Sequence, residues 1–117
     1  MKFHWFHLMP YAELPEDFRE RYSGVWVDVP SAELYDPVKG HQMYQDYLDE
    51  LEHAEREGYD GLCVNEHHQN AYGLMPSPNL MVAALARRTS RAKLVIMGNS
   101  PALYNPPVRV GDEMAML

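Results

Sequence analysis

The sequence has a single cysteine and few positive charges. Among its 117 residues, 10 Lys and Arg oppose 17 Asp and Glu, which gives a formal net charge of -7. Without a basic surface, no counterion release drives nucleic-acid binding, and an anionic membrane repels the chain. Cys63 cannot form an internal disulfide, and its apolar surroundings in the sequence indicate a packed, reduced thiol. These features argue against nucleic-acid and membrane partners and favour a cytoplasmic location.

Several functional motifs are also missing. Residues 1–6 lack the order of a signal peptide, and no apolar run approaches the ~18 residues that span a bilayer. The chain contains neither the G-x-G-x-x-G motif of dinucleotide-binding folds nor the G-x-x-x-x-G-K-[ST] motif of P-loops. The G-x-S-x-G turn of serine hydrolases is absent as well. A function must therefore be sought in other residues.

Three short apolar runs predict buried strands. They cover residues 2–9, 60–65 and 93–97, and each is too short for a typical helix. Helical stretches separate them, so the order strand, helix, strand, helix, strand, helix predicts an α/β fold with a parallel sheet.

Three helices are expected between and after these strands. From Met43, apolar residues recur every three or four positions until Gly58, which is typical of an amphipathic helix. Ser77 and Pro78 start a second helix, which is apolar nearly all round over residues 80–86 and should be almost entirely buried. A third helix follows residues 106–107, where two prolines suit a helix start.

The loops are long only where a strand leads into a helix. They cover residues 10–42, where a short helix near 15–22 is expected, and residues 66–76 and 98–105. In α/β proteins, ligands bind in such loops at the carboxyl ends of the strands. The aromatic side chains of residues 10–42 could cover a flat apolar ligand or only anchor a long loop. This edge of the sheet is the predicted site.

Glu66-His67-His68, directly after the second strand, is the most informative local pattern. A carboxylate beside two imidazoles can orient one ring, select its tautomer and support proton transfer near neutral pH. The structural alternative is that both rings only hydrogen-bond loop carbonyls. A metal site that adds His4 and His7 is disfavoured, because adjacent side chains of an extended chain point in opposite directions. No metal is expected.

Four segments in a specific order and spacing carry a resemblance to a known family. They are Gly58-Tyr59-Asp60-Gly61, Glu66-His67-His68, residues 77–78 with 83–91, and Asn105-Pro106-Pro107-Val108-Arg109-Val110 with Glu113 and Leu117. Together they resemble the bacterial luciferase-like flavin-dependent monooxygenases, a family that also includes deazaflavin-dependent reductases and dehydrogenases. The resemblance covers nearly the whole chain.

The resemblance implies a partial barrel. Members of this family are (β/α)8 barrels, so residues 1–117 are expected to form one partial TIM-barrel domain of about three βα units. Three strands cannot close a barrel. The loop over about residues 10–42 is expected to be a long insertion after the first strand.

The resemblance also implies roles for individual residues. His67 is expected near the flavin ring, where it assists the oxygen chemistry, with Glu66 supporting it and His68 as a third catalytic candidate. The expected cofactor-binding residues are His7, Met97, Gly98, Asn99 and Ser100. A non-prolyl cis peptide is expected at Gly98–Asn99, although such a bond costs about 2.5–4 kcal/mol. Arg109 matches a helix-start motif and is expected to be structural.

The expected function is that of a monooxygenase. Reduced FMN, supplied by a separate flavin reductase, would react with O2 to oxidise a small organic substrate. One alternative is hydride transfer with a deazaflavin coenzyme, with His67 as the base. Another is a non-catalytic flavin-binding or partner subunit. By the same resemblance, the full-length protein is expected to be a homodimer.

Overall fold

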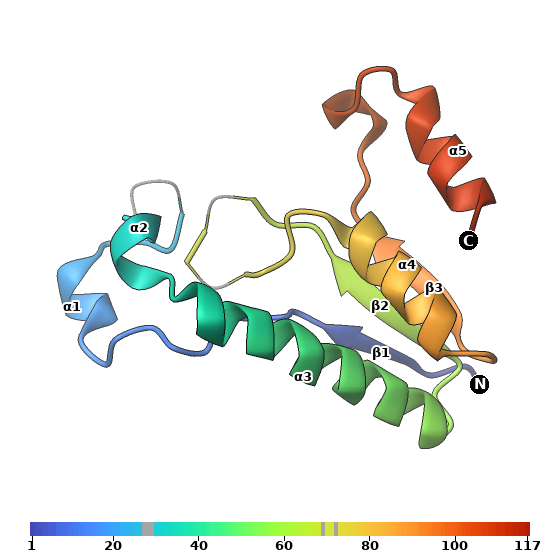
Figure 1. Ribbon diagram of the computed structural model, residues 1–117, viewed down its shortest axis with the longest axis horizontal. Helices are drawn as coiled ribbons and strands as arrows, with labels where there is room; N and C mark the ends of the chain where they lie inside the picture. Colours follow the sequence, from blue (N-terminus) through green and yellow to red (C-terminus); the bar gives the residue numbers. More distant parts are fainter. Residues whose placement is uncertain (27–29, 69, 72) are drawn as a thin grey trace.

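The fold is built around a small parallel sheet (Figure 1). The computed structural model describes residues 1–26, 30–68, 70–71 and 73–117. Three strands lie in the order β1-β2-β3, namely β1 (His4–His7), β2 (Gly61–Asn65) and β3 (Lys93–Met97). Both pairs are parallel, with α3 (Pro37–Arg56) leading into β2 and α4 (Pro78–Arg88) leading into β3. The predicted α/β class and parallel sheet are confirmed.

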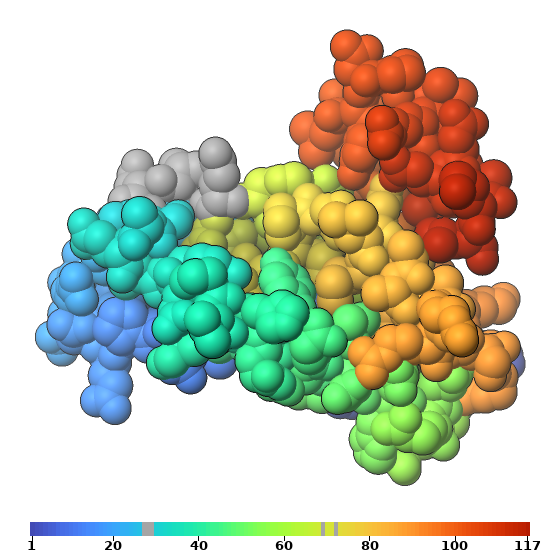
Figure 2. Space-filling model, viewed as in Figure 1, coloured from blue at the N-terminus to red at the C-terminus, as the bar shows by residue number. Residues whose placement is uncertain are grey.

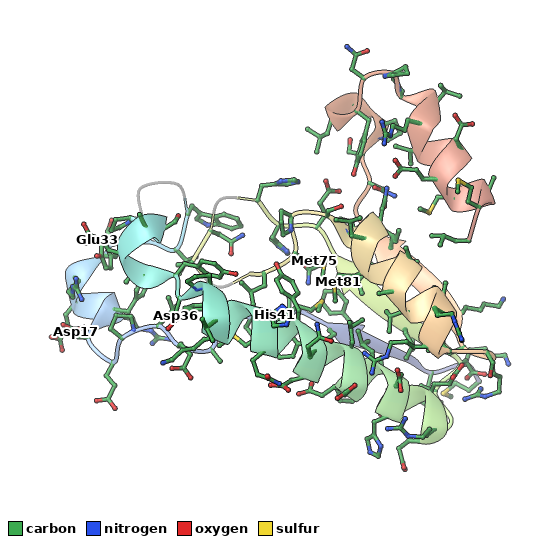
Figure 3. The ribbon with its side chains drawn as sticks, in the orientation of Figure 1. Asp17, Glu33, Asp36, His41, Met75 and Met81 are labelled. Atoms are coloured by element: carbon green, nitrogen blue, oxygen red, sulfur yellow. The ribbon has the colours of Figure 1, made fainter. Side chains whose placement is uncertain are left out.

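Both long helices cover the same face of the sheet (Figure 1). The core between them contains the fully buried side chains of Leu51, Leu62, Val64 and Leu85. Met75 and Met81, from the loop after β2 and from α4, lie near one another in this core (Figure 3). An amphipathic helix gains its stability by burying one apolar stripe in this way.

The opposite face of the sheet is open in the part of the chain that the structure describes. Phe6 of β1 and Met97 of β3 are 46% and 57% exposed. The prediction that the first and third strands are buried was therefore wrong for most of their residues. The reason is position, because β1 and β3 are the two edges of the sheet and only the central strand β2 is buried along its whole length.

Helix α3 begins earlier than the expected start at Met43. Asp36 lies at its amino-terminal end (Figure 3), where its Oδ1 accepts hydrogen bonds from the N–H groups of Val38 at 2.8 Å and Lys39 at 3.2 Å. Pro37 occupies the first turn, a position that proline favours. The loop predicted over residues 10–42 is shorter as a result. Neither α3 nor any other helix in the described ranges has the length and hydropathy needed to cross a bilayer.

Helix α4 is buried on one side only, which corrects the expectation of nearly complete burial. Met81, Val82 and Leu85 face the core, whereas Leu80 is 72% exposed. The apolar run does not distinguish these faces, because an exposed face of a helix can also carry apolar residues. Pro78 lies in the first turn as predicted, but the side chain of Ser77 makes no capping hydrogen bond.

The remaining elements lie at the two ends of the molecule. The loop after β1 contains α1 (Phe18–Arg21), which confirms the short helix expected near residues 15–22, and α2 (Ser31–Leu34). Within that loop, residues 27–29 lie outside the described residues. After β3, a 3-10 turn (Pro101–Leu103) leads into α5 (Val108–Ala115). Figure 2 shows α5, in red, projecting from the body of the molecule.

A single carboxylate stabilises the turn between α4 and β3. Glu55 of α3 accepts hydrogen bonds from the backbone N–H groups of Ser90, Arg91 and Ala92, the last two at 2.7 Å. The N–H of Ala92 is the main reason that the pKa of Glu55 lies below its usual range; burial opposes this effect, and the N–H groups of Arg91 and Ser90 add to it. Glu55 thus connects two segments that are far apart in the sequence.

We predict that Glu55→Gln lowers the free energy of unfolding by about 1–2 kcal/mol at neutral pH, because charged hydrogen bonds to the turn are weakened. Since folding lowers the pKa of Glu55, its contribution is present above the pKa of the unfolded state and is lost as the pH falls through the pKa of the folded state. The difference between wild type and variant should therefore shrink in acid. Urea denaturation at several pH values measures this, with Glu57→Gln, at the exposed residue directly after α3, as the control. Equal effects of the two substitutions would contradict the prediction.

Candidate active site

The predicted site residues cluster at the carboxyl edge of the sheet. Because the strands are parallel, their carboxyl ends lie at the same edge, with Asn65 of β2 in register with Met97 of β3 (Figure 1). The loops that follow these two strands therefore start side by side. Glu66 approaches Gly98 and Asn99 for this reason, although the sequence places them far apart.

The carboxylate of Glu66 links three parts of the site. Its side chain is 7% exposed, its Oε1 lies 2.9 Å from Nε2 of His68, and its Oε2 accepts a hydrogen bond from the backbone N–H of Asn99. Burial raises the pKa of Glu66, but the hydrogen bonds from His68 and Asn99 outweigh this effect, and the pKa lies below its usual range. Glu66 is therefore an ionised anchor near neutral pH, and both its oxygens are engaged.

The two histidines of the motif have different partners. His68 extends toward solvent and pairs with Glu66. His67 is held by its backbone N–H, which donates to the carbonyl of Met75 at 2.8 Å, and by its ring, whose Nδ1 lies 2.6 Å from Oδ1 of Asn65. The family resemblance implied that Glu66 supports His67, whereas the observed side-chain partner of the Glu66 carboxylate is His68.

The long loop after β1 reaches this site. The backbone N–H of Ala71, in the loop after β2, donates to the carbonyl of Val25 at 2.7 Å. The Trp26 indole lies with its centroid 6.2 Å from that of the His67 ring, at an interplanar angle of 33°. The loop thus lies beside His67, and this contact fits both roles predicted from its composition, covering a ligand and anchoring the loop.

Gly98 and Asn99 form a tight turn after β3. A Cβ atom at Gly98 would lie 2.5 Å from Cβ of Glu66, so a side chain cannot fit there without displacing Glu66. Asn99 has a φ of 65°, in the left-handed region that asparagine tolerates better than most residues. Its side chain accepts a hydrogen bond from the hydroxyl of Tyr104 at 2.8 Å. Burial, together with the nearby carboxylate of Glu66, raises the pKa of Tyr104.

The expected cis peptide at Gly98–Asn99 was wrong. The cis bond among the described residues is Asn105–Pro106, and Gly98–Asn99 is trans. A non-prolyl cis bond persists only where packing enforces it. Here the turn is made instead by the left-handed backbone of Asn99 and by the hydrogen bond from its N–H to Glu66.

The other predicted cofactor residues differ in their surroundings. His7 is buried between β1 and α3, where its Nε2 lies 2.8 Å from Oε2 of Glu50 and its Nδ1 accepts a hydrogen bond from Met9 N–H at 2.8 Å. Its ring packs on Tyr47. Nε2 thus serves the packing of β1 on α3, and Nδ1 holds the backbone just after β1. Met97 and Ser100 are exposed at the end of β3 and just after it.

Three residues of the site were missed by sequence reasoning. Asn65 was treated as the last residue of a buried strand, and Trp26 and Tyr104 as parts of loops. The available signal was a polar amide at the end of an otherwise apolar strand. Buried polar groups are nearly always hydrogen-bonded, so such a residue indicates a partner nearby.

Within the described residues, no group of three or more His, Cys, Asp or Glu side chains is arranged to hold a metal ion.

These features define an α/β protein with its polar cluster in the loops at the carboxyl ends of parallel strands, where enzymes of this class bind their ligands. The chain belongs to the luciferase-like monooxygenase family, whose sequence profile matches residues 23–117. At the level of the family, this membership supports an oxidoreductase.

Individual relatives agree with this family. The chain is 35% identical over 75 residues to limonene 1,2-monooxygenase of Rhodococcus erythropolis, a match that covers 64% of this chain and 19% of that enzyme. It is 29% identical over 75 residues to the oxygenase component of the flavin-dependent trigonelline monooxygenase of Acinetobacter baylyi, covering 64% and 21%. It is 38% identical over 55 residues to 4-hydroxyprotoasukamycin monooxygenase of Streptomyces nodosus, covering 47% and 15%. The chain thus spans about a fifth of the length of the relatives it matches.

Proposed function

We propose that the intact protein is a flavin-dependent monooxygenase that uses reduced FMN and O2 to oxidise a small organic substrate. The observation that carries this proposal is the cluster of Glu66, His67 and His68, which Asn65 and Asn99 hold at the carboxyl edge of the sheet. Membership of the luciferase-like family and three relatives named as monooxygenases support the same class of reaction.

The residues at this edge fit the ring system of a flavin. Trp26 and His67 offer aromatic surface at 6.2 Å from each other, and Met97 exposes an apolar side chain at the end of β3. The turn at residues 98–99, whose peptide bond is trans, adds polar backbone groups beside these side chains. Residues 66–76 and 98–105 contain neither Lys nor Arg, so these loops suit the ring of FMN and provide no cation for its phosphate.

Bound reduced flavin would supply the electrons that activate O2, and the protein would supply orientation, a dry environment and control of protons. In this proposal His67 holds or moves a proton beside the ring. Glu66 does not carry that proton itself, because its lowered pKa keeps it ionised and its oxygens hold His68 and the turn after β3. The loop after β1 excludes water, as its contact with Ala71 and the position of Trp26 suggest.

We further propose that the three βα units are the beginning of a (β/α)8 barrel. All long helices lie on one face of the sheet, and the apolar side chains of Phe6 and Met97 are exposed on the other. In a barrel that second face points inward and is covered by further strands. Homodimer formation is proposed from the family resemblance, and the exposed Leu80 on α4 is compatible with a subunit contact.

A separate flavin reductase is proposed as the partner that delivers reduced FMN. The trigonelline relative is named as an oxygenase component, which supports a division of labour between two proteins. The 117 residues contain no G-x-G-x-x-G motif, which is the usual signature of a site for a nicotinamide dinucleotide.

Anaerobic titration of the intact protein with reduced FMN tests the proposed function. We expect saturable binding that Gly98→Ala weakens about tenfold or more, because overpacking beside Glu66 typically costs ~1–3 kcal/mol. Gly111→Ala on α5, where a Cβ meets nothing within 4 Å, is the matched control and should bind as wild type does.

The same titration, combined with a separate aerobic measurement of oxygen uptake, separates the alternatives. Binding of a reduced deazaflavin coenzyme in place of FMN would favour hydride transfer over oxygenation. Binding of FMN without any oxygen uptake in the presence of substrates would favour a non-catalytic subunit. Absence of binding to either coenzyme would overturn the proposal.

A further inference from the structure

Asn65, at the end of β2, has a fully determined amide orientation. The residue is 2% exposed, and its Nδ2 donates hydrogen bonds to the carbonyls of His7 at 3.0 Å and Leu8 at 2.8 Å. A backbone carbonyl can only accept, so the NH2 group must face these two oxygens. The amide oxygen of Asn65 consequently faces the ring of His67.

This orientation decides which nitrogen of His67 carries the proton. Oδ1 of Asn65 has no hydrogen, and it lies 2.6 Å from Nδ1 of His67. A hydrogen bond at this distance requires a donor, which only Nδ1–H can provide. In the neutral ring the lone pair is then on Nε2. The hydrogen bonds of the buried Asn65 side chain thus determine the tautomer of His67 through its Nδ1 atom.

We propose that Asn65 is a positioning residue that locks neutral His67 in the Nδ1–H tautomer, so that the lone pair of the neutral ring lies on Nε2, which can only accept a proton or a hydrogen bond. The tautomer follows from the geometry alone, and its consequence for catalysis rests on the proposed function. In a flavin enzyme, His67 would act as a proton acceptor in its neutral state, and only the imidazolium form could donate from Nε2.

This assignment separates the two histidines of the motif. Glu66 holds His68 through Nε2, and Asn65 holds His67 through Nδ1. An amide, unlike a carboxylate, selects a tautomer without adding a negative charge that would favour the imidazolium. Asn65 therefore makes Nε2 the acceptor nitrogen of the neutral ring.

Nitrogen-15 NMR of the intact protein, labelled at histidine, tests the proposal at a pH where His67 is neutral. The chemical shifts of the two ring nitrogens distinguish Nδ1–H from Nε2–H, and His67→Gln assigns the signal. We expect Nδ1–H in the wild type, whereas free imidazole side chains favour Nε2–H. Observation of Nε2–H in the wild type would overturn the proposal without any variant.

Two variants separate positioning from a structural role. Asn65→Leu and Asn65→Asp both remove the donors to His7 O and Leu8 O, but Asp retains an oxygen that faces Nδ1. We expect Asp to keep the Nδ1–H tautomer and Leu to lose it, with turnover about 10–100-fold lower in the Leu variant and partly restored in the Asp variant. Retention of Nδ1–H in both variants would overturn the proposal, because it would show that Asn65 only hydrogen-bonds the carbonyls of His7 and Leu8 and does not select the tautomer of His67.

The outcome remains decisive if the Leu variant does not fold, because the wild type and the Asp variant still report the tautomer. Failure of the proposed function has a different signature. It would leave the tautomer of His67 unchanged and would appear as absence of flavin binding in the anaerobic titration.

Discussion

Replacement of His67 by alanine should lower turnover by about 10²–10⁴-fold while flavin binding stays largely intact, if the ring exchanges a proton during the reaction. The backbone of His67 is held by its hydrogen bond to Met75, so the loop should keep its course when the ring is removed. The measurement is substrate-dependent oxygen uptake by the intact protein, with reduced FMN supplied by a flavin reductase. Binding of reduced FMN is measured separately under anaerobic conditions.

The matched control for this prediction is His53→Ala. His53 lies on the exposed side of α3, with Glu57 at 3.9 Å as an ion-pair partner. Its removal should change neither turnover nor binding. Turnover like that of the wild type in His67→Ala would remove His67 from the mechanism, and a loss of flavin binding alone would assign it a binding role.

Replacement of Leu51 by alanine should lower the free energy of unfolding by about 2–5 kcal/mol. Leu51 is fully buried in the carboxyl-terminal half of α3, where it belongs to the core formed with Leu62, Val64 and Leu85. Truncation removes apolar contacts and leaves a cavity that neighbouring strands and helices cannot fill completely. Urea denaturation of the intact protein, followed by circular dichroism, measures the loss.

Val38→Ala in the same helix serves as the control. Val38 is largely exposed near the start of α3, so its truncation should change stability by less than about 0.5 kcal/mol. A similar loss in both variants would contradict the observed packing of α3 on the sheet, because it would mean that the two faces of the helix are equally buried.

Local patterns predicted the order of the elements well. The third strand was expected over residues 93–97 and is found there, and the second differs by one residue at its start. Apolar runs of this length, separated by helical periodicity and short turns, have few other solutions in an α/β fold. The start of α3 was missed because the first turn depends on the Asp36 cap and Pro37, and periodicity carries no information about either.

Burial was predicted less well than element type. The edge strands and one side of α4 are exposed although their sequences are apolar, as Phe6, Leu80 and Met97 show. Hydrophobicity indicates that a residue can be buried, but the neighbours that would cover it come from distant parts of a fold. Sequence reasoning could therefore identify the apolar positions without knowing which of them form the core.

The sequence by itself determined the α/β class, the parallel order of the strands, the edge at which the polar loops meet and the residue types gathered there, because these follow from local periodicity and chain direction. Only the tertiary structure decided how those residues pair. Glu66 contacts Asn99 and His68, and Asn65 connects the end of β1 to His67. Hydrogen bonds are sensitive to differences of a few tenths of an ångström in the distance between their groups, and the groups on different strands reach these positions only once the register of the sheet is formed.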